Sequence, residues 1–393
     1  ADEGVMPQTR EHMEICQLLK VKKGVVALTK IDLVDDPDWL EMVKEDVADF
    51  LVGTFLENAA IIPLSAATGE GIDDFKKALT QLIEEVEPRS PEGPFRLSVD
   101  RVFTMRGFGT VVTGTSISGR LHIGSPVIVY PSGHKTKVRG IQVHNEEVEE
   151  VLPGQRTAIN LQSTERALIQ RGNVVATPGS LIPNHMVDVH LELLASAPRV
   201  LKSRAKIRFH TGTSEYLATI VLLDKEELKP GEKAFAQIRI DEPVAVLRAD
   251  RFVIRSYSPV LTIGGGSILH PLPHKHKGHD KRNAAKKLET LLGGDEASII
   301  LWHILDAGWG GVSEQELRIR ANVSTKVFDK SLQQFISQKR AILYDKENRR
   351  LVHPEVMGKL KGMILDSLSD YHRRFPLKTG PPKEELAARL PKP

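Results

Sequence analysis

The sequence predicts a multidomain chain, with an alternating α/β part, then two antiparallel β-barrels, then winged-helix (α+β) units. A chain of 393 residues is too long for a single hydrophobic core. Residues 25–28 and 60–64 are continuous apolar runs, each followed by a helical pattern, which is typical of an open α/β sheet. Residues 95–272 carry short β-rich runs separated by turns, and helical patterns return after residue 296.

The composition excludes several classes of protein. A net charge of +3 is small for this length, so no broad nucleic-acid surface is imposed by charge. Cys16 is the single cysteine, which rules out an intramolecular disulfide and favours a cytoplasmic protein. No apolar run reaches the ~18 residues of a membrane span, and we expect no membrane partner.

Polar segments follow both apolar runs of the α/β part, which we expect to cover residues 1–88. Thr29-Lys30-Ile31-Asp32 comes after residues 25–28, and Ser65-Ala66-Ala67 comes after residues 60–64. Ligands of open α/β sheets bind beyond the carboxyl ends of the strands, so both segments belong to a candidate site. Amphipathic helices are expected over residues 8–20, 38–56 and 72–85.

The residue types at these strand ends suit guanine. The Asp32 carboxylate can accept hydrogen bonds from the N1–H and N2–H₂ groups of guanine, a pair of donors that adenine lacks. The stem of Lys30 can lie along the base, and the backbone N–H of Ala66 can donate to the carbonyl oxygen of the base. Alternatively, Asp32 caps the following helix and Ser65 caps a turn.

Residues 2–12, Thr29 to Asp32 and Ser65 to Ala67 together resemble the second half of the GTP-binding domain of translational GTPases related to elongation factor Tu. The resemblance implies part of an α/β P-loop-type GTPase domain, with GTP as the cofactor. It assigns guanine binding to six residues: Thr29, Lys30, Asp32, Ser65, Ala66 and Ala67. The family usually has Asn in place of Thr29.

The phosphate loop G-x-x-x-x-G-K-[ST] of this family does not occur in the sequence. The Mg²⁺ ligands and the catalytic histidine would lie before Ala1, whereas His12 falls on the helix that follows. We therefore expect a chain cut at both ends, with no catalytic residue and no metal ligand. Without phosphate and Mg²⁺ contacts, this chain alone should neither hydrolyse GTP nor hold it tightly.

Two barrels are expected over residues 94–180 and 184–272, after a Pro/Gly-rich linker. Arg106 to Thr115 resembles the second domain of elongation factor Tu, with Arg106 to Gly109 as a turn, and residues 251–255 resemble the third domain. Gly264 to Gly266 predict a bulge or a tight bend. The expected strands include residues 127–130, 138–143, 157–161, 173–176, 187–194, 205–209, 217–222, 234–240 and 251–254.

The first barrel strand carries Asp100 and Arg101 side by side. Strict alternation places Arg101 on the buried face with Leu97 and Val99, where an unpaired guanidinium is costly. One interpretation is a cation that awaits an anionic ligand atom. The other is a bulge marked by Val102, with Arg101 paired to a neighbouring carboxylate.

FRLSVDR, RGFGTVVTGT and PGQR narrow the resemblance to the bacterial selenocysteine-specific elongation factors. That resemblance implies an aminoacyl pocket at Asp100, Arg101 and Arg156, whose positive charge favours selenolate over the hydroxyl of serine. It also implies GTP-dependent delivery of selenocysteinyl-tRNA to the ribosome at a recoded stop codon, by a monomer. An mRNA hairpin would bind winged helices beyond this chain.

The last third predicts a linker over residues 273–285, a winged helix over 286–353 and a truncated second winged helix over 354–393. The linker holds His274, His276 and His279, for which a solvated or phosphate-facing segment is favoured over a metal site.

Two other functions stay open. One is the GTPase subunit of a sulfate-activating adenylyltransferase, which has no winged helices. The other is a non-catalytic RNA-binding adaptor, which only the sequence upstream of Ala1 would distinguish.

Overall fold

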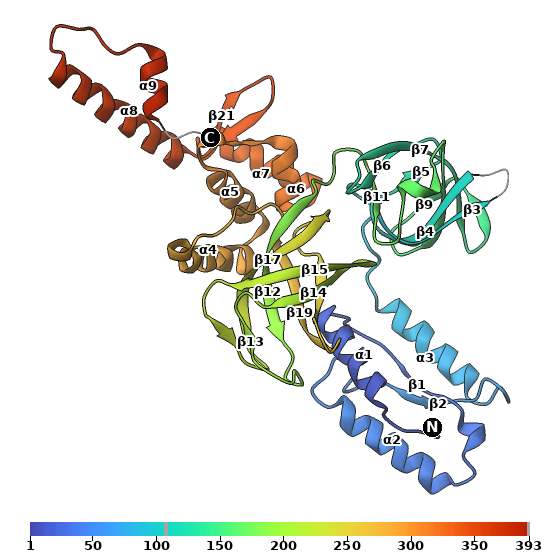
Figure 1. Cartoon of the computed structure of the whole chain (residues 1–393). Coiled ribbons are helices and arrows are strands. Elements are labelled where there is room, and N and C mark those ends of the chain that lie inside the picture. The colour runs from blue at the N-terminus through green and yellow to red at the C-terminus, as the bar shows by residue number, and fades with distance from the viewer. Residues whose placement is uncertain (106–108, 391–393) are drawn as a thin grey trace.

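Three hydrophobic cores organise the computed structural model, which describes residues 1–105 and 109–390. They belong to barrel II, barrel III and the winged helix, in chain order. Barrel III lies in the middle, with the α/β part, barrel II and the winged helix around it (Figure 1). The turn predicted over Arg106 to Gly109 falls mainly on residues 106–108, which lie outside the described residues.

The α/β part has two parallel strands with helices on both sides of them in the chain. Continuous apolar runs are typical of strands buried on both faces, but this sheet has only two strands among the described residues and leaves β2 half-buried throughout. The elements are α1 Pro7–Leu18, β1 Val26–Leu28, the 3₁₀ turn η1 Ile31–Leu33, α2 Pro37–Leu51, β2 Ile61–Pro63 and α3 Ile72–Glu84.

Barrel II is closed by six antiparallel strands in the order β10-β4-β3-β11-β6-β7, with β7 pairing back to β10. Alternate residues of β3 and β6 point inward, as their period-2 pattern predicts, and meet in one core. The strands are β3 Arg96–Met105, β4 Gly109–Ser118, β6 Pro126–Tyr130, β7 His134–Val143, β10 Arg156–Leu161 and β11 Val174–Ala176.

Barrel III is a second closed barrel, in the order β12-β17-β15-β14-β18-β19. Gly264 to Gly266 lie inside β19 and pair in unbroken register with residues 191–193, so no bend interrupts the strand there. The predicted bulge lies one residue earlier, because the pairing on the other edge shifts between Ile254–Gly264 and Arg255–Thr262. The strands are β12 Asn184–Leu193, β14 Lys206–Thr211, β15 Ser214–Leu222, β17 Lys233–Val244, β18 Arg251–Ser256 and β19 Thr262–His270.

The winged helix packs directly on barrel III, because Leu223 and Leu269 of the barrel belong to the winged-helix core. Helix α4 begins at Lys281, inside the range expected as a linker, and buries a face that includes Leu288. Its elements are α4 Lys281–Gly293, α5 Glu296–Asp306, β20 Val312–Ser313, α6 Glu314–Ala321, α7 Thr325–Ser337, β21 Ile342–Asp345 and β22 Arg350–Val352.

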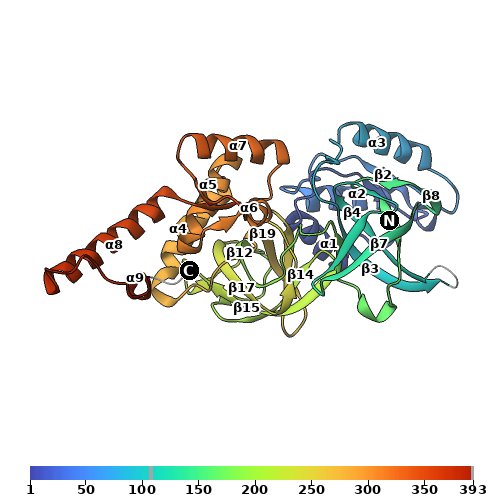
Figure 2. The same cartoon turned by 90° about the horizontal axis from the view of Figure 1, so that it is seen from above.

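Beyond the winged helix, α8 Pro354–Arg374 extends outward and α9 Lys383–Arg389 folds back beside it. Figure 2 shows this arm at the opposite end of the molecule from barrel II. Among the described residues, no helix is long and apolar enough to cross a membrane.

Specific polar contacts fasten barrel III to its neighbours. Arg96 of barrel II makes two hydrogen bonds to Asp250, with Nη1–Oδ2 at 2.8 Å and Nη2–Oδ1 at 2.6 Å. On the other side, Glu11 of α1 accepts hydrogen bonds from Arg255 (2.8 Å) and from the hydroxyl of Thr262 (2.7 Å). Barrel III therefore sets the positions of both candidate sites.

Candidate functional site

The two polar segments of the α/β part lie at one edge of its sheet. Leu28 and Pro63, the last residues of β1 and β2, are direct partners in the parallel pair. The N–H of Leu64 donates to Leu28 O at 2.9 Å, and the N–H of Ile31 donates to Leu64 O at 3.5 Å. Residues 29–32 and 65–67 are thereby brought together, as the strand-end argument predicts.

Asp32 presents a carboxylate that the rest of the described chain leaves free. Lys30 has left-handed backbone angles (φ 62°, ψ 39°) and starts η1, which carries Asp32. Asp32 is exposed, and its carboxylate accepts no hydrogen bond from any described residue. The alternative in which Asp32 caps the next helix is wrong, because Asp36 caps α2 by accepting from Asp38 N at 3.0 Å.

Ser65 fixes the backbone turn of the second segment, residues 65–67. Its buried hydroxyl accepts hydrogen bonds from the N–H groups of Ala67 (3.1 Å) and Thr68 (3.2 Å), so the turn-capping role considered for Ser65 is confirmed. This turn leaves Ala66 and Ala67 exposed, and no described residue accepts from the N–H of Ala66. A donor and an acceptor therefore face solvent from neighbouring loops.

The second candidate site lies at a β-bulge in barrel II. Val99 pairs with Gly114, but the next pair is Arg101 with Thr113, so Asp100 is the extra residue on β3. The bulge resets the alternation and leaves Arg101 exposed. Strict alternation, which places Arg101 on the buried face, is therefore wrong at this position.

Asp100 binds one partner from the adjacent strand β4 and one from β10, the strand beyond β4. Its Oδ1 accepts hydrogen bonds from the hydroxyl of Thr113 (2.7 Å) and from Nη2 of Arg156 (3.2 Å), and its Oδ2 accepts from Nη1 of Arg156. Burial acts to raise the pKa of Asp100. The hydrogen bonds from Arg156 and Thr113, with the charges of Arg156 and Arg101, outweigh burial and lower this pKa.

Arg101 is the second arginine of this site, and the Asp100 carboxylate does not bind it. Arg156, rather than Arg101, is the arginine that pairs with the neighbouring carboxylate, so the alternative is correct about the bulge and wrong about the pair. Arg101 forms no ion pair with any described residue. The three predicted residues are therefore brought together with one positive charge in excess.

Sequence reasoning missed Thr113 and the contacts of α1. Thr113 lies directly across the β3–β4 pair from the bulge, and a hairpin register drawn from the sequence would have found it. Glu11 and Arg255 are 244 residues apart, so no local pattern joins them.

His276 of the linker pairs with Asp188 at 2.7 Å, and no group of three metal-ligating residues occurs among the described residues. The His279 side chain lies outside them.

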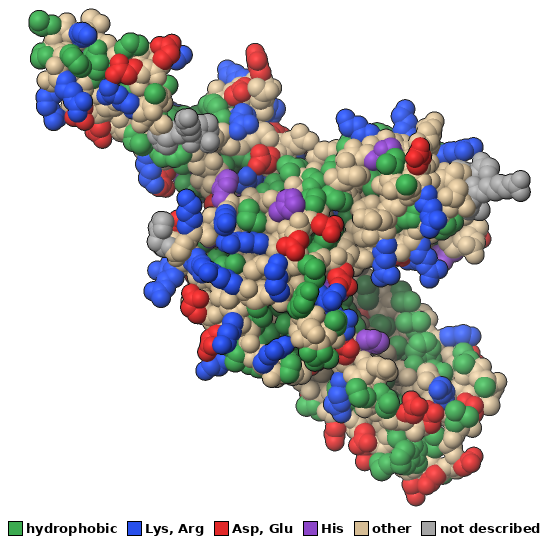
Figure 3. All heavy atoms as spheres, in the orientation of Figure 1, with side chains coloured by type: hydrophobic (Ala, Val, Ile, Leu, Met, Phe, Trp, Pro, Cys, Tyr) green, Lys and Arg blue, Asp and Glu red, His purple; other side chains and the backbone are tan. Residues whose placement is uncertain are grey.

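Charge is unevenly distributed over the molecule. On the face in Figure 3, basic side chains spread over barrel III and the adjoining helices, while acidic side chains gather at the outer end of the α/β part. The candidate guanine site therefore belongs to an acidic lobe, and the positive patches lie toward barrel III.

Four family models match this chain, each over a different part. "Elongation factor Tu GTP binding domain" matches residues 1–85 and "Elongation factor Tu domain 2" matches residues 109–176. "Selenocysteine-specific elongation factor, beta-barrel domain" matches residues 186–275, and "Elongation factor SelB, winged helix" matches residues 365–393. Part of a GTP-binding domain followed by two barrels defines a protein of the elongation factor Tu class.

Two relatives carry the name selenocysteine-specific elongation factor. The one from Desulfomicrobium baculatum is 44% identical over 98% of this chain, which covers 60% of that protein. The one from Haemophilus influenzae is 30% identical over 70% of this chain, which covers 43% of that protein. The chain thus spans about 60% or less of the length of these relatives.

Two solved structures of selenocysteine-specific elongation factors are also similar to this chain. A crystal structure of a bacterial selenocysteine-specific elongation factor, EF-Sec, aligns with a TM-score of 0.80 at 27% identity, over 98% of this chain and 60% of that one. Apo SelB from Methanococcus maripaludis aligns with a TM-score of 0.62 at 26% identity, over 69% of this chain and 63% of that one. The chain belongs to the family of bacterial selenocysteine-specific elongation factors. The predicted fold class is confirmed, and neither the adenylyltransferase subunit nor the adaptor is favoured.

Proposed function

We propose that the protein acts in selenocysteine incorporation, by GTP-dependent delivery of selenocysteinyl-tRNA to the ribosome at a recoded stop codon. Family membership supports this function. The observation that carries it is the exposed Arg101 beside the Asp100–Arg156 pair. The protein would work as a cytoplasmic monomer, and the mRNA hairpin would bind winged helices beyond the present one.

The proposed aminoacyl pocket selects by charge. Asp100 neutralises Arg156, so the unpaired Arg101 supplies the positive potential. A selenol is largely ionised at neutral pH, whereas the hydroxyl of serine is neutral. A charge-assisted contact to the selenolate is about twice as strong as a neutral one, which favours selenocysteine over serine on the tRNA.

The test is the substitution Arg101→Ala in the longest natural form of the protein, with GTP present. We expect affinity for selenocysteinyl-tRNA to fall by roughly tenfold and affinity for seryl-tRNA to change little, because only the selenolate loses a charge-assisted contact. Arg166→Ala removes an exposed charge elsewhere on barrel II and is the matched control. Equal losses for both tRNAs would contradict the proposal.

The proposed guanine site uses Asp32 as the acceptor for N1–H and N2–H₂ of the base. Lys30 lies along the base, Ala66 N–H donates to its carbonyl oxygen, and Thr29, Ser65 and Ala67 form the surrounding loops. The free carboxylate of Asp32 and the free N–H of Ala66 at one sheet edge support this assignment.

Asp32→Asn tests the base contact. The amide N–H₂ would face the donors of guanine but could donate to the second carbonyl of xanthine. GTP affinity should fall and XTP affinity should rise, each by roughly tenfold or more. Asp36→Asn keeps the cap of α2 and is the control. An unchanged preference for GTP would exclude Asp32 from the site.

The proposal assigns no Mg²⁺ ligand and no catalytic residue to this chain. The phosphate loop is not in the sequence, so the 393-residue polypeptide by itself should turn over no GTP. Release of phosphate from GTP by the purified polypeptide would contradict this expectation.

A further inference from the structure

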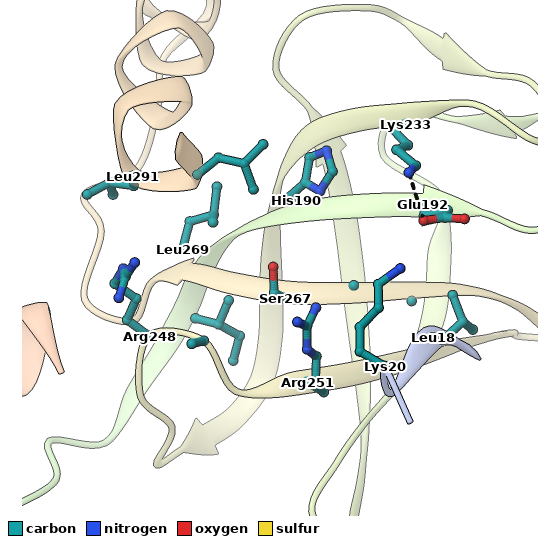
Figure 4. A pocket seen from close by; sticks show the side chains of 15 residues that line it. Leu18, Lys20, His190, Glu192, Lys233, Arg248, Arg251, Ser267, Leu269 and Leu291 are labelled. Atoms are coloured by element: carbon teal, nitrogen blue, oxygen red, sulfur yellow. Dashed lines mark ion pairs between the residues drawn. The ribbon is translucent and has the colours of Figure 1, made fainter. Parts of the chain in front are cut away.

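A cavity of about 290 Å³ lies where α1, barrel III and α4 meet. Leu18 comes from the end of α1, residues 265–269 of β19 form the floor, and Leu291 of α4 closes one side. Figure 4 shows its polar lining, with Lys20 and Arg251 near Ser267, and Arg248 toward α4. The charged and titratable residues that line it are Lys20, His190, Glu192, Lys233, Arg248 and Arg251.

Positive charge dominates this lining. Lys233 pairs with Glu192 at 3.3 Å, which neutralises both. Lys20, Arg248 and Arg251 form no ion pair with any described residue. Three cations therefore surround a space in which no carboxylate is left to balance them.

The nearest other carboxylates do not restore the balance. Asp250 lies between the two arginines in the chain but is held by Arg96 of barrel II. Glu296 and Asp224 act on Arg248 and His190 only as distant charges. The excess of positive charge in the cavity therefore remains when barrel II, barrel III and the helices are assembled.

Arg248 is partly withdrawn from water without compensation, whereas Arg251 is exposed. Arg248 is half-buried, and its Nε is buried with no hydrogen-bond partner. Burial lowers the pKa of Arg248 and of Arg251. A guanidinium without an acceptor is costly in such a place, and an anionic ligand with several oxygens would remove that cost.

Part of the floor of the cavity is bare backbone, at Gly265 and Gly266. A Cβ on Gly266 would lie 1.9 Å from His190 O, so only glycine fits the close pairing of β19 with β12. Leu18 of α1 lies over Gly265, and no side chain from this stretch fills the space. A ligand can therefore approach the sheet between the cations.

We propose that this cavity binds a phosphate group, with Arg248 and Arg251 as fork-like donors and Lys20 as a third cation. Arginine matches the geometry of phosphate oxygens, and the volume is sufficient for phosphate or pyrophosphate. Because Lys20 lies in the turn that follows α1, the ligand fastens the α/β part to barrel III. The site shares no residue with the proposed guanine and aminoacyl sites.

The phosphate could come from a small compound or from an RNA backbone, and one titration distinguishes them. Pyrophosphate is titrated calorimetrically into the 393-residue chain at low ionic strength, where screening is weak. We expect saturable binding that Arg248→Gln/Arg251→Gln weakens by roughly tenfold or more. Competition by an RNA duplex, lost in the same variant, assigns the site to backbone phosphate, and its absence assigns it to a small phosphate compound.

Matched controls make the result decisive. Lys202→Gln/Arg204→Gln removes the same charge from exposed positions of the same barrel and should change the affinity less than about twofold. If the arginine variant does not fold, Lys20→Gln decides, because Lys20 is exposed and its loss should weaken binding by roughly threefold. No pyrophosphate binding by the parent chain, or equal losses in the control, would overturn the proposal.

Discussion

The two barrels have the same six-stranded closed architecture but use their irregular positions differently. Barrel II places a bulge on β3 that turns Arg101 toward solvent and holds Asp100 against Arg156. Barrel III places glycines in β19, where backbone meets backbone and α1 packs above. The bulge exposes a charged side chain, whereas the bare strand allows α1 to pack closely on the barrel.

The contacts of the barrels follow this difference. Barrel III receives α1 through Glu11, the winged helix through Leu269, and barrel II through Asp250. The bulge face of barrel II keeps Arg101 free of ion pairs with the described residues. We infer that barrel III is the structural centre of the molecule and that barrel II carries the candidate site at the bulge.

Asp250→Asn should have the largest effect on the comparison, because it breaks the joint between the barrels. Arg96 and Asp250 are only 10% and 17% exposed, so removing the carboxylate leaves a buried cation unpaired. We expect a loss of about 3 kcal/mol, seen in calorimetry as a melting temperature lower by roughly 6 °C or more.

The control for this pair is Arg96→Met/Asp250→Asn, which removes both charges and should recover part of the lost stability. Asp224→Asn removes an exposed carboxylate of the same barrel and should change little. A single variant as stable as the parent would show that the joint contributes nothing.

Gly266→Ala and Gly140→Ala compare one glycine inside a strand of each barrel. The new methyl group would meet His190 O at 1.9 Å in barrel III, but its nearest neighbour in barrel II, Asn160, is 4.0 Å away. We expect a loss of about 2 kcal/mol for Gly266→Ala. Gly140→Ala should be neutral or stabilising by up to about 1 kcal/mol. Thermal unfolding of both variants checks this, and equal melting temperatures would contradict it.

Asp100→Asn should have a smaller effect that depends on pH. The pKa of Asp100 is lowered in the folded protein, so its stabilising contribution is present above the unfolded value of roughly 3.9 and is lost as pH falls through the lower folded value. We expect the variant to lose about 1 kcal/mol at neutral pH and to show a shallower decline below pH ~4.

Urea unfolding across this acidic range measures the pH dependence. Asp241→Asn removes an exposed partner of Lys206 in barrel III and serves as the control for loss of one charge. If Asp100→Asn and the parent chain lose stability in parallel as pH falls, the carboxylate does not stabilise the bulge.

Glu11→Gln should have the smallest effect. Glu11 and Arg255 are 35% and 32% exposed, so solvent screens their interaction and the expected loss is below about 1 kcal/mol. Faster hydrogen exchange of the α1 amides would reveal the weaker docking on barrel III. Glu14→Gln on the same helix is the control, and identical exchange in both variants would show that Glu11 does not hold α1.

Most of the fold follows from local patterns. Alternating apolar residues predict the strands of both barrels, and Ser313 and Ser324, whose residue type favours helix starts, cap α6 and α7. β19 was missed because its three glycines interrupt the apolar pattern. Helix α4 was missed because Ala284 and Leu288 form an apolar face only when they pack on barrel III.

The sequence identified the residues of the candidate sites but not their arrangement in space. Strict alternation of side chains does not allow for an inserted residue, so it placed Arg101 on the buried face of the strand. The bulge at Asp100 turns Arg101 to the exposed face instead. Asp32 was correctly placed at a strand end. Its carboxylate is available for a ligand because Asp36, rather than Asp32, caps α2. The cation cavity had no sequence signal, because its residues come from parts of the chain far from one another.

By itself the sequence determined the order of the parts, the strand-end loops and the family, because each depends on residues close together in the chain. Only the tertiary structure decided which charges are paired. Arg156 reaches Asp100 across two strand pairings, Asp250 binds Arg96, and Arg248 Nε has no acceptor among the described residues. Ion pairing depends on distances of a few ångströms between distant segments, which no local pattern contains.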